Sequence, residues 1–476
     1  MADADLTEYE RLREENIRRN EVILASVRRN ADELSAAIKA SDPRSVLRRK
    51  ADELPAAIKT SDPRSVLRRS LRLSQPPPDA HPTPPAPNPT PSRRRAPRKP
   101  KRRRRAPRRT TPGNAKPRST TFSSSLASTI LEAVSLSPGA AKLRAYDFDA
   151  GKELVLTPAN VRTLLPSRIL GLLVLPLVDR TMVAAGDNLG NIGFWHADPE
   201  PGAVVADGVF EYLPHRGPVA AIVAHPAMPH KIYSCSYKGE ICLMDLEKEN
   251  FNIIYSCQSP VISLCQAPDS ASCIYVGDGS GELKLFDERM GKVSATWESH
   301  DNRINSIDFH PEKKHMIATS STDKTTRIWD LRRLEKKKED CLKVLEHSRS
   351  VQSAYFSPSG RMLATTSYED TVQVFHGDDF DSLHIIKHNN QTGTWLSTFK
   401  AIWGWNDTDL FIGNMKRAID VISVGSSGGG ISASNSVCLE SGHMTVIPCR
   451  FSAHPYKVGH LACASSNGKV FLWTRA

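Results

Sequence analysis

Long apolar segments are missing from this chain of 476 residues. No run reaches the roughly 18 to 20 apolar residues that a membrane-spanning helix needs. Residues 1–30 are charged and lack the apolar core of a secretion signal. The nine cysteines form no C-x-x-C pair and their number is odd, which is typical of reduced thiols. We therefore expect a soluble intracellular protein that does not bind a membrane.

Catalytic signatures are missing as well. The P-loop, G-x-S-x-G and H-E-x-x-H motifs and paired Cys/His spacings are all absent. The glycines of residues 276–282 precede a strand-like segment, whereas a phosphate-binding glycine loop precedes a helix. We therefore expect no enzymatic activity, no metal site, no cofactor and no small-molecule substrate.

Aromatic residues are absent between Tyr9 and Phe122. Residues 73–143 are rich in proline and arginine, and 12 of the 17 residues in 93–109 are Lys or Arg. Because so little apolar surface cannot offset the entropy lost on ordering, we expect a disordered basic linker. Such an arm suits phosphate backbones and the acidic grooves of import receptors. Its clustered cations include Arg93, Arg94, Arg95, Lys101, Arg102, Arg103, Arg104 and Arg105.

The positive charge belongs to the N-terminal part alone. Residues 1–144 hold 32 basic and 15 acidic residues (+17) and the rest hold 32 and 37 (−5), which gives the +12 of the whole chain. A basic arm on a mildly acidic globule is typical of a tether to nucleic acid or of a nuclear import signal. We predict that the protein is nuclear.

A tandem duplication marks residues 1–72, which show helical spacing of apolar residues. Residues 31–50 and 51–70 are identical at 17 of 20 positions. Each copy contains a Ser-Asp-Pro step, at Ser41 and Ser61, and this step is a helix start signal. We expect short amphipathic helices, which are either a recent duplication in a permissive surface segment or a duplicated docking helix.

Seven related units follow from residue 144. Each contains an apolar segment, a segment of small residues, a Gly/Asp/Asn turn and a segment that usually carries an aromatic residue near its end. The corresponding positions are Trp195, Met244, Phe286, Trp329, Phe375, Val421 and Trp473, at intervals of 49, 42, 43, 46, 46 and 52 residues. This spacing matches the blades of WD-repeat proteins. The sequence predicts an all-β fold, a seven-bladed WD-repeat β-propeller over residues 144–476.

The fourth unit shows how a blade is fixed. We expect a buried hydrogen-bond chain of His300, a strand hydroxyl (Thr319 or Ser321), Asp323 and Trp329, because such a network fixes strand register. The second and sixth units carry Met244 and Val421 in place of Trp, and we expect packing alone to hold them. Trp473 lies three residues from the end of the chain, so we assign residues 144–157 as the outer strand that closes the ring.

Two surface features indicate partners. The first is an aromatic-Asp-x-Arg sequence that ends two consecutive units, at Asp287/Arg289 and at Trp329/Asp330/Arg332. It is either an ordinary WD turn with a local ion pair or a contact for a partner carboxylate.

The second feature is an aromatic cluster in residues 388–409, which hold Trp395, Phe399, Trp403 and Trp405 with Lys400. Some of these residues belong to the core. An apolar hairpin tip beside a cation can also wedge into a nucleic-acid stack. We expect Trp395 to be an exposed contact, with Lys416 and Arg417 of the next turn as phosphate ligands.

Three stretches resemble the WD-repeat protein 76 family, which is related to the small subunit of the damaged-DNA-binding complex. They are LTEYERLREENIRRNEVIL, RTLLPSRILGLLVLP and HNNQTGTWLSTFKAIWGW. The resemblance implies a damage-response protein on chromatin that serves as a substrate receptor for cullin-4 RING ubiquitin ligases. It further implies that Asp287, Arg289, Trp329, Asp330 and Arg332 contact the ligase adaptor, and that residues 391–395, from Gln391 to Trp395, lie with Lys400 at the DNA face. Thr394 stands where the family leads us to expect an arginine.

The leading hypothesis is therefore a nuclear DNA- and chromatin-binding propeller that also acts as a ubiquitin-ligase substrate receptor. The alternative is a non-catalytic scaffold that reads histone or other peptide tails and touches DNA only through the basic arm. The −5 charge of the propeller favours this alternative.

Overall fold

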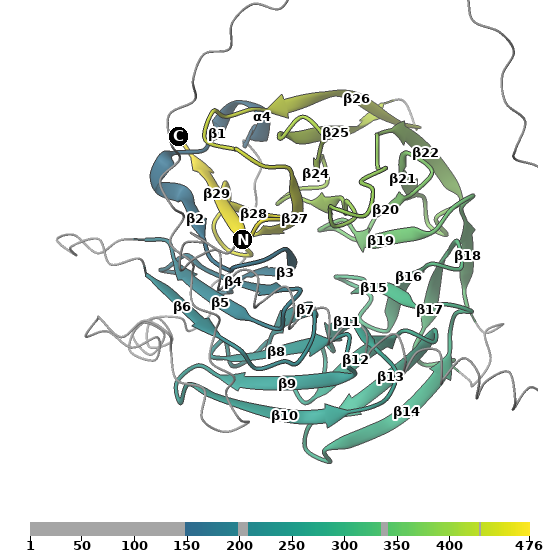
Figure 1. The fold of residues 1–476 in the computed structure, drawn as a ribbon. Coiled ribbons are helices and arrows are strands. Elements are labelled where there is room, and N and C mark those ends of the chain that lie inside the picture. The colour runs from purple at the N-terminus through teal and green to yellow at the C-terminus, as the bar shows by residue number, and fades with distance from the viewer. Residues whose placement is uncertain (1–147, 199–207, 335–340, 428–429) are drawn as a thin grey trace, which may run out of the picture. The chain divides into compact units, whose positions relative to one another are not determined.

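Seven antiparallel sheets surround a common axis in the computed structural model, which describes residues 148–198, 208–334, 341–427 and 430–476 (Figure 1). The predicted seven-bladed β-propeller is confirmed. The helical segment predicted for residues 1–72 and the basic arm predicted for 73–143 lie outside the described residues.

Six sheets contain four consecutive strands each, and the seventh is completed from the other end of the propeller. The strands of the first three blades are β3 (Ile169–Val174), β4 (Met182–Asp187), β5 (Ile192–His196), β6 (Val209–Tyr212), β7 (Val219–Ala224), β8 (Lys231–Ser236), β9 (Glu240–Asp245), β10 (Asn250–Ser256), β11 (Val261–Gln266), β12 (Cys273–Asp278), β13 (Glu282–Asp287) and β14 (Lys292–Glu298). Those of the other four are β15 (Ile304–Phe309), β16 (Met316–Ser321), β17 (Thr325–Asp330), β18 (Lys343–Glu346), β19 (Val351–Phe356), β20 (Met362–Ser367), β21 (Thr371–His376), β22 (Ser382–Lys387), β23 (Ile402–Trp403), β24 (Asp409–Gly413), β25 (Ile419–Ser427), β26 (Gly430–Leu439), β27 (Pro448–Ala453), β28 (Leu461–Ser465) and β29 (Lys469–Arg475).

The burial of the strands explains their composition. Every residue of β4, β20 and β28, second strands of their blades, is buried, and these strands are built from small and apolar residues. Both faces of such a strand pack against neighbouring blades, which leaves no room for an alternating polar face. The outer strand β14 instead alternates exposed and half-buried residues, as expected for a strand with one solvated face.

The hydrogen-bond chain predicted for the fourth blade is present. His300 Nε2 lies 2.7 Å from Thr319 Oγ1, and Trp329 Nε1 donates to the same hydroxyl at 2.8 Å. His300 Nδ1 lies 2.8 Å from Asp323 Oδ2. Of the two hydroxyls considered, Thr319 and not Ser321 takes this place. Burial disfavours the Asp323 carboxylate, but the hydrogen bond with His300 outweighs it and keeps the pKa of Asp323 below its usual value.

The prediction that packing alone holds the second and sixth blades is wrong. In the second blade His215 Nε2 lies 2.8 Å from Ser234 Oγ. In the sixth blade His388 Nε2 lies 3.2 Å from Asp420 Oδ2. A polar ring is costly to bury without partners, so these pairs fix the blades in which Trp is replaced.

Histidine followed by proline marks the turn between the first and second strands in three blades. Nδ1 of His225 accepts hydrogen bonds from the backbone N–H groups of Ala227 and Met228. His310 and His454 accept in the same way from the residues two and three positions later. Burial lowers the pKa of all three histidines, which keeps the rings neutral and able to accept. The motif is therefore a turn cap.

The ring is closed by two short strands, one within the predicted segment 144–157 and one just after it. β1 (Leu154–Val155) pairs with the end of β29, and β2 (Val161–Thr163) pairs with its start. The predicted closing role of 144–157 is confirmed by β1, but its extent is corrected, because α4 (Ala150–Glu153) occupies part of the segment and the pairing resumes in β2 after the short helix η2 (Pro158–Asn160). No helix in the described part of the chain is long and apolar enough to cross a membrane.

Replacing Thr319 with valine removes the hydroxyl that Trp329 and His300 share and leaves a buried indole N–H without an acceptor. We expect the free energy of unfolding to fall by about 1–3 kcal/mol, measured by urea denaturation of the whole chain. Thr296→Val on the exposed side of β14 is the matched control and should change nothing. Equal stability of the two variants would contradict the assigned role.

Candidate nucleic-acid and adaptor interfaces

The antiparallel strand order divides the loops of the propeller between two faces. In each four-stranded blade the first and third turns lie at one end, and the second turn and the connection to the next blade lie at the other. We call the second end the Trp395 face, because Trp395 lies in the connection between the fifth and sixth blades. We call the first end the Arg332 face, because Arg332 lies in the turn after β17. The candidate DNA-binding and adaptor-binding loops are therefore on opposite faces.

The two faces differ in charge. Among the described loops, the Trp395 face has nine basic and five acidic residues, and the Arg332 face has nine and eleven. The loops of the Trp395 face hold Arg168, Arg216, Lys238, Arg303, Lys324, Arg349, Lys400, Lys416 and Arg417, with Asp301, Asp323, Glu369, Asp370 and Glu440. Those of the Arg332 face hold Arg180, Lys248, Arg289, Lys313, Lys314, Arg332, Arg333, Arg361 and Lys457, with Asp179, Asp198, Glu247, Glu249, Asp269, Glu288, Glu312, Asp378, Asp379, Asp381 and Asp407. The Trp395 face is the one that suits a polyanion.

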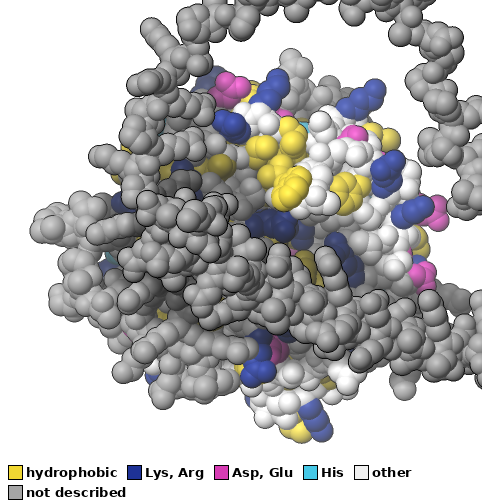
Figure 2. All heavy atoms as spheres, viewed as in Figure 1, with side chains coloured by type: hydrophobic (Ala, Val, Ile, Leu, Met, Phe, Trp, Pro, Cys, Tyr) yellow, Lys and Arg dark blue, Asp and Glu magenta, His cyan; other side chains and the backbone are white. Residues whose placement is uncertain are grey.

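Large apolar side chains are exposed on the Trp395 face as well. Trp395 is 87% exposed, more than any other large hydrophobic residue among those described. Leu189, Tyr237 and Met415 are also exposed and lie in loops of this face. Figure 2 shows one face of the ring, on whose uncovered part Lys and Arg side chains lie near the middle beside a group of apolar side chains. Exposed aromatic groups among cations are typical of surfaces that bind unstacked nucleic acid.

The loop of residues 388–401 is tied across the ring. Ser397 Oγ donates a hydrogen bond to Ile169 O in the first blade at 3.4 Å. Arg168 Nη1 donates to Thr394 O at 3.2 Å. The exposed indole therefore stands on a loop that is held on both sides. The Arg168 guanidinium therefore lies next to Thr394. Position 394 is where the family resemblance leads us to expect an arginine.

The other aromatic residues of this stretch belong to the core. Phe399 is 1% exposed and Trp403 is 6% exposed. Trp403 Nε1 donates to Tyr355 O, and Trp405 Nε1 donates to His454 O. No strand pairing occurs between β22 and β23, so the predicted apolar hairpin is corrected to a loop with one exposed indole.

Lys416 and Arg417 form the turn between β24 and β25, and both side chains are exposed. Asn414 Oδ1 accepts the N–H of Lys416 at 2.9 Å, and Arg417 has a φ of 67°. The backbone of this turn therefore presents both cations on the Trp395 face. Gln391 is exposed on the same face, and its amide donates to Asp370 Oδ2 at 3.1 Å.

Lys400 is half-buried and reaches across to another blade. Its Nζ donates to Asn305 O at 3.0 Å, and its side chain lines the central channel. It stands two positions before β23, the innermost strand of its blade, and this place turns the side chain toward the axis. Lys400 therefore lies at the Trp395 end of the channel and not at a hairpin tip, and its place at the DNA face stays a prediction.

Asp287 and Asp330 end the third strands of consecutive blades in the same geometry. Oδ1 of each accepts the N–H of the arginine two residues later, at 2.9 Å for Arg289 and 3.0 Å for Arg332. Arg332 also donates two side-chain hydrogen bonds to Asp330, at 3.0 and 2.7 Å, and these lower the pKa of Asp330 to about 2. The side chains of Arg289 and Arg332 remain 75% and 65% exposed. Both arginines keep N–H donors for a partner.

Trp329 cannot join this surface. It is 1% exposed and donates its only side-chain N–H inside the blade. Successive side chains of a strand point to opposite faces, so that Trp329 enters the core while Asp330 reaches the turn. The prediction of Trp329 as an adaptor contact is therefore corrected.

Known proteins are similar to this chain in sequence. The family model "WD domain, G-beta repeat" matches residues 291–330 and 339–376. The DNA damage-binding protein cmr1 of Aspergillus clavatus is 29% identical over 357 residues, which cover 65% of this chain and 65% of the relative. The DNA damage-binding protein CMR1 of Phaeosphaeria nodorum is 25% identical over 398 residues, or 71% of this chain and 75% of the relative. The WD repeat-containing protein 76 of Xenopus laevis is 30% identical over 275 residues, or 56% and 46%.

These relatives support the resemblance of the chain to the WD-repeat protein 76 family. The chain spans 65% of the length of the Aspergillus clavatus relative. The family resemblance stated from the sequence is thus confirmed.

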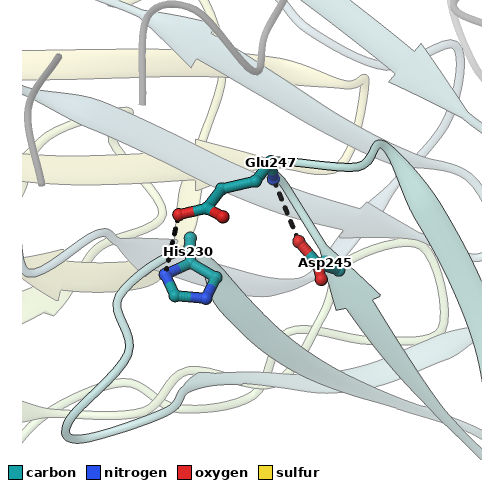
Figure 3. Close-up of side chains that lie close together, drawn as sticks. All are labelled: His230, Asp245 and Glu247. Atoms are coloured by element: carbon teal, nitrogen blue, oxygen red, sulfur yellow. Dashed lines mark hydrogen bonds and ion pairs between the residues drawn. The ribbon is translucent and has the colours of Figure 1, made fainter. Parts of the chain in front are cut away.

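A third aspartate of this WD-repeat chain repeats the turn of Asp287 and Asp330. Asp245 Oδ1 accepts the N–H groups of Glu247 and Lys248, at 3.1 and 3.3 Å. Figure 3 shows His230 turned toward the Glu247 carboxylate, at 3.4 Å. Asp245, Glu247 and His230 could reach a common metal ion, but the Asp245 carboxylate also pairs with Lys248. We interpret the group as a turn cap with a local ion pair.

The exposure of Trp395 gives a direct test of its role outside the core. Trp395→Ala should leave the free energy of unfolding unchanged within about 0.5 kcal/mol. Trp403→Ala, eight residues later, should lower it by about 3–5 kcal/mol because it opens a buried cavity. Urea denaturation of both variants checks this. A loss in Trp395→Ala as large as that in Trp403→Ala would show that this indole is packed in solution.

Proposed function

We propose that the chain is a non-catalytic nuclear protein that binds DNA through its Trp395 face and acts on chromatin in the response to DNA damage. The observation that carries this proposal is Trp395, an indole with 87% of its surface exposed, on a firmly tied loop among basic loops. The relatives named DNA damage-binding proteins support it.

The exposed indole and the cations would contact different parts of the DNA. Lys416, Arg417 and the other basic loop residues neutralise phosphates, which supplies affinity without sequence preference. Trp395 offers a flat apolar surface for a base that has left the stack. Distorted or mismatched duplexes offer such bases at the lowest unstacking cost. An exposed indole combined with basic loop residues therefore favours damaged over intact DNA.

Much of the acidic charge on the Trp395 face is held within the fold. Glu369 Oε1 lies 2.9 Å from His347 Nδ1, and Asp323 pairs with His300. Asp370 Oδ1 accepts the backbone N–H of Asn390, with a distance of 2.9 Å. These contacts hold the Asp323 and Glu369 carboxylates inside the fold, where their side chains are 5% and 13% exposed, and away from a phosphate backbone at the surface.

The alternative, a scaffold that reads a histone tail, fits the centre of the propeller less well. Lys400 and Arg450 line the central channel, and neither forms an ion pair with a carboxylate of the described residues. A basic tail entering the channel would meet the Arg450 guanidinium and the Lys400 amino group. We therefore favour DNA over a histone tail as the partner of the Trp395 face.

The basic arm, residues 93–109, completes the proposal. Its cations would add phosphate contacts and direct nuclear import. This segment lies outside the described residues, and its role rests on charge alone.

Binding to DNA should depend separately on the indole and on the cations. Trp395→Ala should weaken binding to a mismatched duplex by about fivefold to a hundredfold, since one aromatic stack contributes about 1–3 kcal/mol, with a smaller effect on intact duplex. Lys416→Ala combined with Arg417→Ala should weaken both duplexes alike and reduce the slope of log K against log salt by about two. Fluorescence anisotropy at several salt concentrations measures both effects.

The matched control removes two cations from the other face, in Arg289→Ala with Arg332→Ala. This control should bind both duplexes like the unaltered protein, whereas an equal loss of slope would mean that no face is preferred. Deleting residues 93–109 should flatten the salt dependence and keep the preference for mismatched DNA. Loss of that preference on deletion would assign DNA recognition to the arm.

We further propose that the Arg332 face binds the adaptor of a cullin-4 RING ubiquitin ligase, so that the chain serves as a substrate receptor. Two consecutive blades present the same Asp–Arg turn with an exposed guanidinium. Each aspartate orients its arginine and leaves donors for a carboxylate of the partner, which arginine binds in a planar, directional way. Because the two faces are opposite, DNA and adaptor could be bound together.

Arg289→Ala combined with Arg332→Ala should abolish recovery of the adaptor in a pull-down from nuclease-treated extract. Stability should fall by less than about 1 kcal/mol, because both arginine side chains are exposed and each aspartate keeps its backbone N–H donor. Lys416→Ala with Arg417→Ala is the control and should retain the adaptor. Undiminished recovery with the Arg289/Arg332 variant would refute this surface.

A further inference from the structure

The centre of the propeller contains a cavity of about 290 Å³. It is lined by the innermost strands of the blades, which surround the axis in Figure 1. Most of the lining is apolar or consists of small hydroxyl residues. The charged side chains in the lining are Lys400, Arg450 and Asp308.

The strand positions of these residues place the charges at different depths. Lys400 lies two residues before β23, and Arg450 is the third residue of β27. Innermost strands start at the Trp395 face, so both cations lie toward that end of the channel. Asp308 is the fifth residue of β15 and lies toward the Arg332 face.

Both cations keep hydrogen-bond donors that the fold does not use. Among the described residues, Lys400 Nζ donates one hydrogen bond, to Asn305 O at 3.0 Å, and an ammonium has three hydrogens. Arg450 donates from Nε to Leu170 O at 2.7 Å and from Nη1 to backbone carbonyls, which anchors the guanidinium. Within the described part of the chain, Nη2 of Arg450 has no acceptor.

The two positive charges also lack a counter-charge within the described part of the chain. Neither Lys400 nor Arg450 forms an ion pair there. Burial, together with the charges of Arg450 and Arg303, lowers the pKa of Lys400 to about 7. Burial raises the pKa of Asp308 to about 7, and its Oδ2 accepts the N–H of Phe356 at 2.7 Å. Asp308 therefore does not serve as the missing counter-ion.

We infer that the Trp395 end of the channel is a binding site for a phosphate group, held between Lys400 and Arg450. Lys400 and Arg450 line the same cavity, have unused N–H donors and pair with no carboxylate of the described residues, and a bound phosphate would supply the acceptors and the negative charge. The anchored guanidinium provides a fixed half of the site, and the flexible ammonium adjusts to the ligand. This inference does not require the DNA-binding proposal. A free phosphate compound presents the same oxygens as a DNA backbone phosphate and could occupy the site without DNA.

Lys400→Met tests the site, because methionine keeps the apolar stem and removes the charge. Without phosphate, we expect the variant to unfold at the same temperature as the unaltered protein or a higher one, since an unpaired charge has been removed. Inorganic phosphate should raise the melting temperature of the unaltered protein and should not raise that of Lys400→Met. Lys292→Met, on the exposed outer strand β14, is the control and should respond like the unaltered protein. All samples are compared with chloride at matched ionic strength.

Isothermal titration with inorganic phosphate gives a second measure. Saturable binding should weaken about tenfold or more in Lys400→Met, because a charged hydrogen bond is lost. Lys400→Arg, which restores the charge, should recover part of it. Absence of saturable phosphate binding by the unaltered protein, or equal binding by Lys400→Met, would overturn the inference.

The two sources of the phosphate group are separated by competition. If a DNA phosphate occupies the site, inorganic phosphate should weaken DNA binding by the unaltered protein more than by Lys400→Met. If a free phosphate compound occupies it, phosphate and DNA should bind together without competition. Either result supports the phosphate site and identifies which compound occupies it.

Discussion

The pairing of β29 with β1 and β2 is the constraint on which the rest of this structure depends. A blade that ended with an unpaired β29 would leave its outer edge open, and the first and last blades would not be joined. Residues 154–163 supply the missing partner from the segment that leads into the first blade. Once the ring is closed, every innermost strand must start at the same face, and this single geometric rule creates the channel and sorts all loops into two sets.

This sorting gives the protein a polarity that its overall charge conceals. The loops of the Trp395 face and of the Arg332 face have the same number of basic residues, but the acidic residues gather on the Arg332 face. The −5 charge of the propeller region therefore says little about either surface. The net charge of the propeller region favours a basic ligand. The charge of the Trp395 face taken alone does not, because its loops hold more basic than acidic residues. Lys400 and Arg450 extend the positive character of the Trp395 face into the channel.

Some functional residues could be found from the sequence because their neighbours along the chain decide their environment. The His300, Thr319, Asp323 and Trp329 chain follows from positions fixed within one repeat. Trp395 could be selected because one strand of a blade cannot bury four aromatic residues. Other residues could not be found in this way. Trp329 and Asp330 are adjacent in the chain, yet strand alternation sends one into the core and the other to the turn. Lys400 is five residues from Trp395, yet the approach to an innermost strand turns it toward the axis.

By itself the sequence determined the number of blades, the all-β class, the polar chain inside the fourth blade and the family. These follow from spacing and residue type, which are local and repeat along the chain. Only the tertiary structure decided which face each loop occupies, which aromatic residue is exposed, and that Lys400 and Arg450 share a channel although 50 positions separate them in the sequence. Contacts of this kind arise from ring closure, which brings distant blades to one axis, and no local pattern of residues encodes which side chains then meet.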